Sequence, residues 1–228
     1  HYFLLLAPAV SLLLGMAVST ARNEVSAKAG GRGFPAFLPI LIVLAVLAGS
    51  LYKHGSFLLG EAPNQLSRSI YGLNPFPESL EIGKFIRENS GRNDRVAVVG
   101  SEPQIYFYSG RRSATGYIYM YPLMELHEFA LAMQKAMIGE IEAKNPEFLV
   151  FVHVDASWGV QTGSNDTLLK WLDGYQARHY RPAGIIDITR YGTNYYWAPN
   201  LKWPPDSKQW IVVFRRIGDH SPLGGTPQ

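Results

Sequence analysis

Uncharged apolar positions dominate the first quarter of the chain. Residues 2–21 contain no charged side chain, and residues 34–52 (FPAFLPILIVLAVLAGSLY) form a second uncharged run. A helix rises about 1.5 Å per residue, so about 20 residues cover a hydrocarbon core of about 30 Å. The pattern therefore predicts two transmembrane α-helices, over residues 2–21 and 34–52, which form a helical hairpin within residues 1–52.

The segment between these two runs predicts their orientation. Residues 22–33 carry three basic side chains, Arg22, Lys28 and Arg32, against the single acid Glu24. Loops rich in Lys and Arg stay on the cytoplasmic side of a membrane. We therefore expect this loop in the cytoplasm and the long C-terminal part of the chain on the outer side.

Beyond a polar connector over residues 53–73, the hydrophobic pattern alternates between helical and strand periods. Strands separated by helices are typical of βαβ units and a mostly parallel sheet. We expect residues 74–217 to form an extracytoplasmic α/β domain with a mostly parallel, Rossmann-like layered sheet, and residues 218–228 to be a flexible tail. The expected helices are NPFPESLEIGKFIRENSG, PQIYFYSG, about 123–144 and TLLKWLDGYQAR; the expected strands are RVAVVG, EFLVFVHV, YRPAGIIDIT and QWIVVFRRI.

Aromatic residues gather in the segment 191–210, which we expect to be a long loop. It contains three tyrosines and three tryptophans. Aromatic rings stack on the faces of sugars, but they also pack against their own domain or against a membrane surface. The sequence leaves these roles open.

Composition narrows the classes of partner. With 47% hydrophobic and 17% charged residues, the chain suits a packed fold. The net charge of +3 is small, and no stripe of Lys and Arg interleaves with aromatic residues, so we expect no nucleic-acid partner. The absence of cysteine excludes disulfides, thiolate metal sites and a cysteine nucleophile.

Common catalytic motifs are absent from the sequence. The turn after RVAVVG reads GSEPQIYF, which lacks the glycine spacing of a dinucleotide site, and the signatures of P-loops, zinc proteases and serine hydrolases do not occur. The six histidines have no metal-ligand spacing, so we expect neither metal nor cofactor within this chain. A self-contained enzyme that uses His153 and Asp155 with Arg111 or Arg112 remains an alternative, although no spacing rule supports it.

Several stretches together resemble a known family. The chain begins with His-Tyr leading into an apolar helix with an early proline (HYFLLLAPAVSLLLG), followed by a basic loop and a second apolar run. The most specific part is residues 93–117, NDRVAVVGSEPQIYFYSGRRSATGY. In this order the stretches resemble the C-terminal end of bacterial membrane glycosyltransferases of the dolichyl-phosphate-mannose-protein mannosyltransferase type, which are glycosyltransferase family 39 and its relatives in the GT-C superfamily.

The resemblance implies an integral enzyme of the bacterial inner membrane, with its C-terminal domain periplasmic or extracellular. Such an enzyme moves a sugar from a polyprenyl-phosphate carrier to a lipid, glycan or protein acceptor on the outer face, with inversion at the anomeric carbon. The family's acidic base lies in its first outer loop, so we expect this chain to be a C-terminal fragment that is inactive alone. A divalent metal is compatible with the intact enzyme. The alternative is a non-enzymatic, membrane-tethered binding or interaction domain.

Four residues are candidates for substrate binding. By the resemblance, His1 and Tyr2 lie at the outer end of a membrane helix, where they would face the carrier phosphate or simply anchor the helix at the interface. Arg111 and Arg112 follow a predicted helix, where a guanidinium would bind phosphate or an acidic acceptor. The alternative for this pair is an interaction with the helix dipole or with nearby acids.

Overall fold

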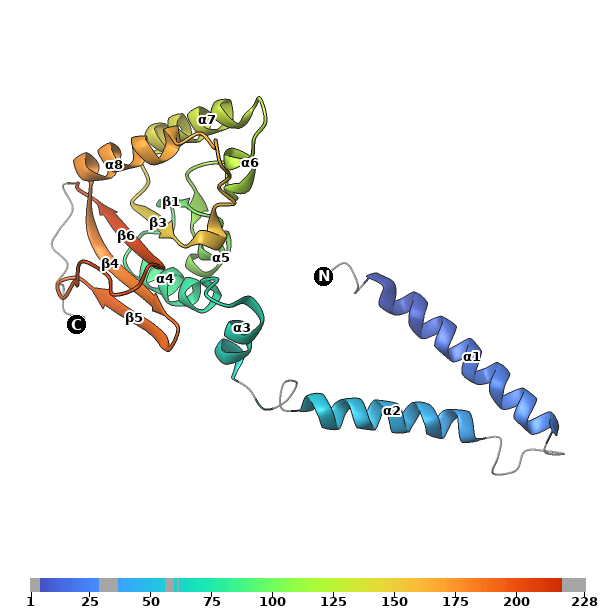
Figure 1. Ribbon diagram of the computed structural model, residues 1–228. Coiled ribbons are helices and arrows are strands. Elements are labelled where there is room, and N and C mark those ends of the chain that lie inside the picture. The colour runs from blue at the N-terminus through green and yellow to red at the C-terminus, as the bar shows by residue number, and fades with distance from the viewer. Residues whose placement is uncertain (1–4, 29–36, 56–59, 61, 219–228) are drawn as a thin grey trace. The chain divides into compact units, whose positions relative to one another are not determined.

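The computed structural model describes residues 5–28, 37–55, 60 and 62–218 (Figure 1). The chain divides into two compact units, His1–Leu66 and Ser67–Gln228. The first unit is helical, and the second unit holds the sheet.

The first unit contains the helices α1 (Ala7–Lys28) and α2 (Leu38–Gly55). Among the described residues, α2 alone is long and apolar enough to cross a membrane. The prediction of two transmembrane helices is therefore wrong for the part that the structure describes. Helix α1 continues through Arg22, Glu24 and Lys28, so the expected loop at 22–33 is helical as far as Lys28. Charged groups disfavour placing the length of such a helix in hydrocarbon.

The expected connector is partly helical. Helix α3 (Pro63–Tyr71) precedes α4 (Phe76–Glu88), and Arg68 of α3 forms an ion pair with the buried Glu78 of α4. The hydroxyl of Thr193 also donates to Glu78. A buried carboxylate is stable only with such partners, so these contacts attach α3 to the sheet domain.

Within residues 62–218 the sheet has six strands in the order β2-β1-β3-β6-β4-β5. Strands β2 and β3 both pair with β1 in parallel, whereas β6 is antiparallel to β3 and to β4, and β5 is antiparallel to β4. The bounds are β1 Arg95–Val99, β2 Arg112–Ser113, β3 Phe148–His153, β4 Tyr180–Thr189, β5 Gly192–Trp197 and β6 Trp210–Arg216.

The prediction of a mostly parallel, Rossmann-like sheet is wrong, because antiparallel pairs outnumber parallel ones. Strands β1, β3 and β4 do follow helices, as expected for βαβ units. After β4, however, the chain turns back in a hairpin to β5 and then inserts β6 between β3 and β4. Hydrophobic periodicity indicates that β6 is a buried strand, but it does not indicate which strands β6 pairs with.

The two faces of the sheet have separate cores. Helices α4 and α5 (Gln104–Ser109) cover the closed face, where Ile82, Ile86 and Ile105 are fully buried against the strands. Helices α6 (Tyr121–Met124), α7 (Ala130–Lys144) and α8 (Thr167–His179) cover the other face, called the open face below (Figure 1). The single helix expected at 123–144 is broken between α6 and α7.

The aromatic segment 191–210 divides into strand and loop. Residues 192–197 form β5, and only residues 198–209 form the loop that leads into β6. Gly184 of β4 lies opposite Trp197 of β5, and a Cβ atom at Gly184 would lie 2.2 Å from the indole ring. The absence of a side chain at Gly184 therefore leaves room for the indole of Trp197 against β4.

Candidate functional site

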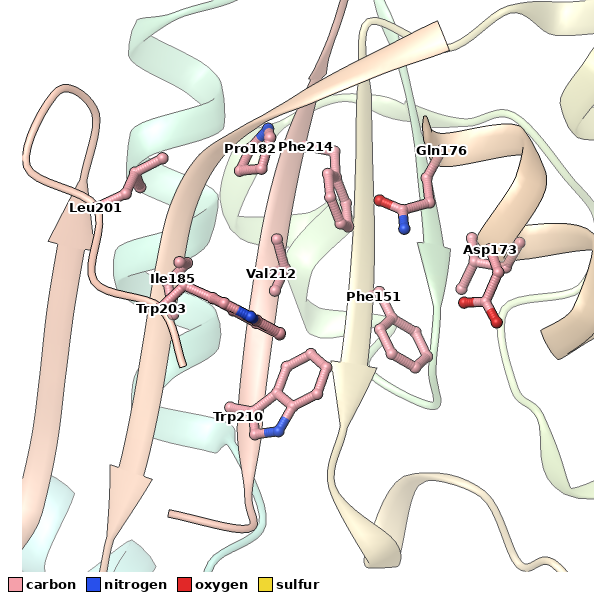
Figure 2. A pocket seen from close by; sticks show the side chains of 11 residues that line it. Phe151, Asp173, Gln176, Pro182, Ile185, Leu201, Trp203, Trp210, Val212 and Phe214 are labelled. Carbon is pink, nitrogen blue, oxygen red and sulfur yellow. The ribbon is translucent and has the colours of Figure 1, made fainter. Parts of the chain in front are cut away.

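A cavity of about 520 Å³ lies on the open face between α8 and the loop 198–209. We call it the aromatic cavity. Figure 2 shows its floor of strand residues, with Leu201 and Trp203 of the loop on one side and Asp173 and Gln176 of α8 on the other. Its lining residues are Phe151, Leu172, Asp173, Gln176, Pro182, Ile185, Leu201, Trp203, Trp210, Val212 and Phe214.

The floor of the cavity follows from the two-residue period of the strands. Phe151 of β3 is paired with Val212 of β6, and Val212 is paired with Ile185 of β4. Paired residues point to the same face of a sheet, so all three side chains face α8 and the loop. Trp210, two residues before Val212, therefore joins the same surface.

Aromatic rings at one end of the cavity meet edge to face. The ring centroids of Trp203 and Trp210 are 5.4 Å apart at 82°, and those of Phe151 and Trp210 are 5.6 Å apart at 73°. Trp203 is 63% exposed, so one of these rings presents most of its surface to solvent. Ring faces of this kind bind C–H-rich surfaces of a ligand.

Two polar side chains of α8 form the opposite wall. Asp173 and Gln176 lie three residues apart and therefore on one face of the helix. Within the described part of the chain, neither side chain makes a hydrogen bond or an ion pair. A carboxylate and an amide are thus available beside a mostly apolar surface.

The buried carboxylate of Asp187 fixes the loop 198–209. Its two oxygens accept hydrogen bonds from the backbone N–H groups of Asp206 and Ser207, each at 3.0 Å. Asp187 is fully buried on β4. Hydrogen bonds to a charged acceptor are stronger than neutral ones, so Asp187 holds the loop that carries Trp203.

A second cavity, of about 360 Å³, lies at the C-terminal end of β3, and we call it the end cavity. Leu169 of α8 and the residues after β3 line it. The full lining is Phe151, His153, Val154, Asp155, Trp158, Gly159, Val160 and Leu169, so the ring of Phe151 borders both cavities.

The loop 198–209 is also joined to the residues after β3. The Gln209 side-chain amide donates to Asp155 Oδ2 at 2.8 Å and accepts from the Asp155 N–H at 3.0 Å. His153 Nδ1 lies 3.1 Å from the Lys208 carbonyl oxygen, and the His153 ring is stacked on Trp210 at 4.4 Å. The borders of the two cavities are therefore held together by hydrogen bonds and ring contacts.

The segment after β3 also contacts the buried carboxyl of Glu102, which is 1% exposed. The Ser157 hydroxyl donates to Oε1, while Oε2 has no partner among the described residues. Burial raises the pKa of the Glu102 carboxyl from 4.5 to about 7, and the hydrogen bond from Ser157 lowers it only in part. The Ser101 hydroxyl donates to the Ser157 carbonyl at 2.5 Å, so residues 101 and 102 both hold the loop after β3.

The arginines predicted from the sequence lie elsewhere. The Arg111 guanidinium donates to the carbonyls of Arg87 and Ser90 at 2.9 and 2.8 Å, at the end of α4. Arg112 is exposed and begins β2, opposite Arg95. His1 and Tyr2 lie outside the described residues. A substrate contact by any of the four stays a prediction.

The alternative set of His153 and Asp155 with Arg111 or Arg112 is not brought together. His153 ends β3, whereas Arg112 pairs with Arg95 at the start of the parallel neighbour β1. A strand rises about 3.3 Å per residue, so the length of β1 separates the two ends. Among the residues that the structure describes, no group of three or more His, Asp and Glu side chains could hold a metal ion.

Sequence reasoning pointed to the segment 191–210 but missed most of the site. Asp187 was detectable as the one charged residue in the apolar strand GIIDIT, where burial demands partners. In the sequence, Asp173 and Gln176 cannot be distinguished from ordinary polar residues on the solvent-exposed face of a helix. In the sequence Phe151 cannot be distinguished from a core residue, because the sequence does not show which strand residues are covered by helices.

Comparisons with protein-family models, with curated proteins and with solved structures gave no match. The geometry of the open face is therefore the structural basis for assigning a function. The resemblance to membrane glycosyltransferases remains an expectation from the sequence motifs.

Proposed function

We propose that the sheet domain binds a carbohydrate in the aromatic cavity and that it does so as the C-terminal domain of a membrane glycosyltransferase. Carbohydrate binding is supported by one observation. The aromatic cavity combines the exposed indole surface of Trp203 with the side chains of Asp173 and Gln176, which make no hydrogen bond within the described residues. The assignment to a membrane glycosyltransferase is supported by the sequence resemblance and by helix α2, which is long and apolar enough to cross a membrane.

The chemistry of the cavity suits a sugar ring. A pyranose has a C–H face that packs on an aromatic ring and a rim of hydroxyls that needs donors and acceptors. Trp203 and Trp210 supply the rings, while Asp173 accepts and Gln176 both donates and accepts. A cavity of about 520 Å³ lies within the range of small-molecule sites.

Helix α2, which is long and apolar enough to cross a membrane, supports attachment of this domain to a bilayer. The basic residues Arg22 and Lys28 precede α2. By the positive-inside rule the N-terminal side of α2 would be cytoplasmic. We therefore place the sheet domain on the outer side of the bacterial inner membrane.

In the proposed enzyme, the donor is a polyprenyl-phosphate sugar, and transfer to a lipid, glycan or protein acceptor proceeds with inversion. The resemblance assigns the general base to a part of the family outside residues 1–228. The role of the sheet domain is to bind and orient the glycan, which lowers the entropic cost of transfer. We accordingly expect no sugar transfer by residues 1–228 alone.

The binding test is a calorimetric titration of the full chain in lipid nanodiscs. The probes are tetrasaccharides of mannose, glucose, galactose and N-acetylglucosamine. At least one tetrasaccharide should bind. Trp203→Ala should lower its affinity about tenfold, because the loss of ring stacking removes about 1.4 kcal/mol of binding free energy.

Tyr191→Ala is the matched control, since Tyr191 is an aromatic residue that is 96% exposed and lines neither cavity. Its affinity should equal that of the native chain. Lack of binding by all four tetrasaccharides, or binding that is unaffected by Trp203→Ala, would refute the proposal. Tight binding of a saturated alkyl chain instead of any glycan would assign the cavity to an apolar ligand.

A further inference from the structure

The two cavities of the open face meet at one side chain. Phe151 lines both, and its ring lies 5.6 Å from that of Trp210 in the aromatic cavity and 6.0 Å from that of Trp158 in the end cavity. His153 of the end cavity stacks on Trp210 of the aromatic cavity with only 4° between the planes. A continuous aromatic surface therefore connects the cavities.

One face of α8 forms a wall along both cavities. Leu169 lines the end cavity, while Leu172, Asp173 and Gln176 line the aromatic cavity. These residues have the helical spacing of i, i+3, i+4 and i+7, and seven residues of helix cover about 10 Å. This wall is longer than a single sugar ring.

The charged groups at the two cavities have one sign. Asp155 lines the end cavity and Asp173 lines the aromatic cavity, and no Lys or Arg occurs among the described residues that line either one. Carboxylates repel uronic acids and sulfated sugars, whereas they accept hydrogen bonds from hydroxyl and amino groups.

We propose that the two cavities are subsites of one groove, which binds an unbranched neutral or amino-sugar oligosaccharide of at least two units across Phe151. This inference rests on the proposed carbohydrate binding and adds the ligand's length and charge. One unit packs at Trp203 and Trp210. The next lies beyond the stacked His153–Trp210 pair, against Trp158 and Val160.

The test compares chain lengths by calorimetry on the full chain in nanodiscs. The probes are the one-, two-, three- and four-unit members of whichever of the four sugar series binds. Affinity should rise about tenfold between one unit and three, because a second subsite adds stacking and hydrogen bonds. A uronic-acid oligosaccharide of the same length should bind at least about tenfold more weakly than the neutral one.

Val160→Arg tests the second subsite, since Val160 is 60% exposed and borders the end cavity. It should reduce tetrasaccharide affinity to that of the single sugar and leave the single sugar unchanged. Leu80→Arg, at an exposed position of α4, is the control and should have no effect. Equal affinities for all lengths, or a length effect that Val160→Arg does not remove, would overturn the groove while leaving the aromatic cavity as a sugar site. Binding of no sugar would instead refute the proposed function itself.

Discussion

The two faces of the sheet are covered to different extents. On the closed face, α4 and α5 pack on a core that includes the fully buried Ala183, Ile186 and Ile188 of the antiparallel strand β4. On the open face, α7 and α8 bury Ala97, Val99 and Leu149, but over β6 and β4 the cover is shared between α8 and the loop 198–209. The face with incomplete helical cover is the one that holds both cavities.

This difference follows from how the chain builds the sheet. Helices arise in the crossovers between strands, and the final strands β4, β5 and β6 are joined by a hairpin and the loop 198–209 instead. In the described part of the chain, α8 lies beside their open face and no helix follows β4 to complete the cover. Aromatic side chains of the loop and of β6 partly fill this space, which leaves apolar surface accessible to a ligand.

The largest expected effect is on the closed face. Ile86→Ala removes a fully buried side chain between α4 and the sheet, and it should lower the free energy of unfolding by about 4 kcal/mol. Leu201→Ala, in the partly covered loop of the open face, should cost only about 1 kcal/mol.

Urea unfolding, followed by circular dichroism of the sheet domain within the full chain, measures both values. Leu80→Ala provides the control on the same helix, because Leu80 is 47% exposed, and it should change the free energy by less than about 0.5 kcal/mol. Equal costs for Ile86→Ala and Leu201→Ala would contradict the distinction between the faces.

The second effect concerns Glu102, which accepts a hydrogen bond from Ser157 in the segment after β3. Its pKa is raised to about 7, chiefly by burial, so between pH 4.5 and 7 the folded state retains a proton that the unfolded state loses. The contribution of Glu102 to stability should therefore be fully present below about pH 4.5 and be lost as the pH rises through about 7, by on the order of 3 kcal/mol. Glu102→Gln cannot ionise and should flatten this part of the profile.

Unfolding free energies measured from pH 4 to pH 8 provide the test. The matched control is Glu125→Gln, because Glu125 is an exposed carboxylate, and its profile should follow that of the native chain. A pH dependence that survives in Glu102→Gln would show that another group is responsible.

A smaller effect is expected at Asp187, which fixes the loop of the open face. Asp187→Asn keeps the shape of the side chain but loses the charge that two backbone N–H groups share, at a cost of about 2 kcal/mol. The loosened loop should also weaken tetrasaccharide binding severalfold. Asp206→Asn is the control, because it removes only the exposed ion pair with Lys202 and should cost less than about 1 kcal/mol.

Amide hydrogen exchange of residues 198–209 separates stability from loop order in these two variants. Faster exchange should be confined to the loop in Asp187→Asn and absent in Asp206→Asn. Unchanged exchange in Asp187→Asn would mean that the loop is held by its other contacts, such as those of Gln209 with Asp155.

The positions of several helices and strands were predictable because local patterns determine local elements, although the predicted fold class was wrong. The helix α4, the strands β1 and β3 and the helix α8 lie where the periodicity and the turn residues predicted them. The pairing partners were not predictable, since β6 follows β5 in sequence but pairs with β3 and β4.

The candidate site was predictable only through its aromatic loop. Trp203 and Trp210 lie in the segment that composition singled out, whereas Phe151, Asp173 and Gln176 join them through the insertion of β6 and the position of α8. The same limit applies to Arg111, for which the sequence left open a contact to phosphate or an acidic acceptor and an interaction with the helix dipole or nearby acids. In the structure it donates to carbonyls at the end of α4, a segment about 20 residues earlier in the chain.

The most direct test of carbohydrate binding on the open face uses the five tryptophans of the chain as internal probes. Trp203 and Trp210 line the aromatic cavity and Trp158 lines the end cavity, whereas Trp171 donates to Glu142 and Trp197 stacks on Phe85 away from both. The measurement is a two-dimensional NMR spectrum of the ¹⁵N-labelled indole groups, assigned by Trp→Phe variants, for the full chain in nanodiscs with and without the binding tetrasaccharide. We predict shifts of the Trp203, Trp210 and Trp158 signals and unchanged signals for Trp171 and Trp197. Unchanged Trp203 and Trp210 signals at saturating glycan would contradict the account.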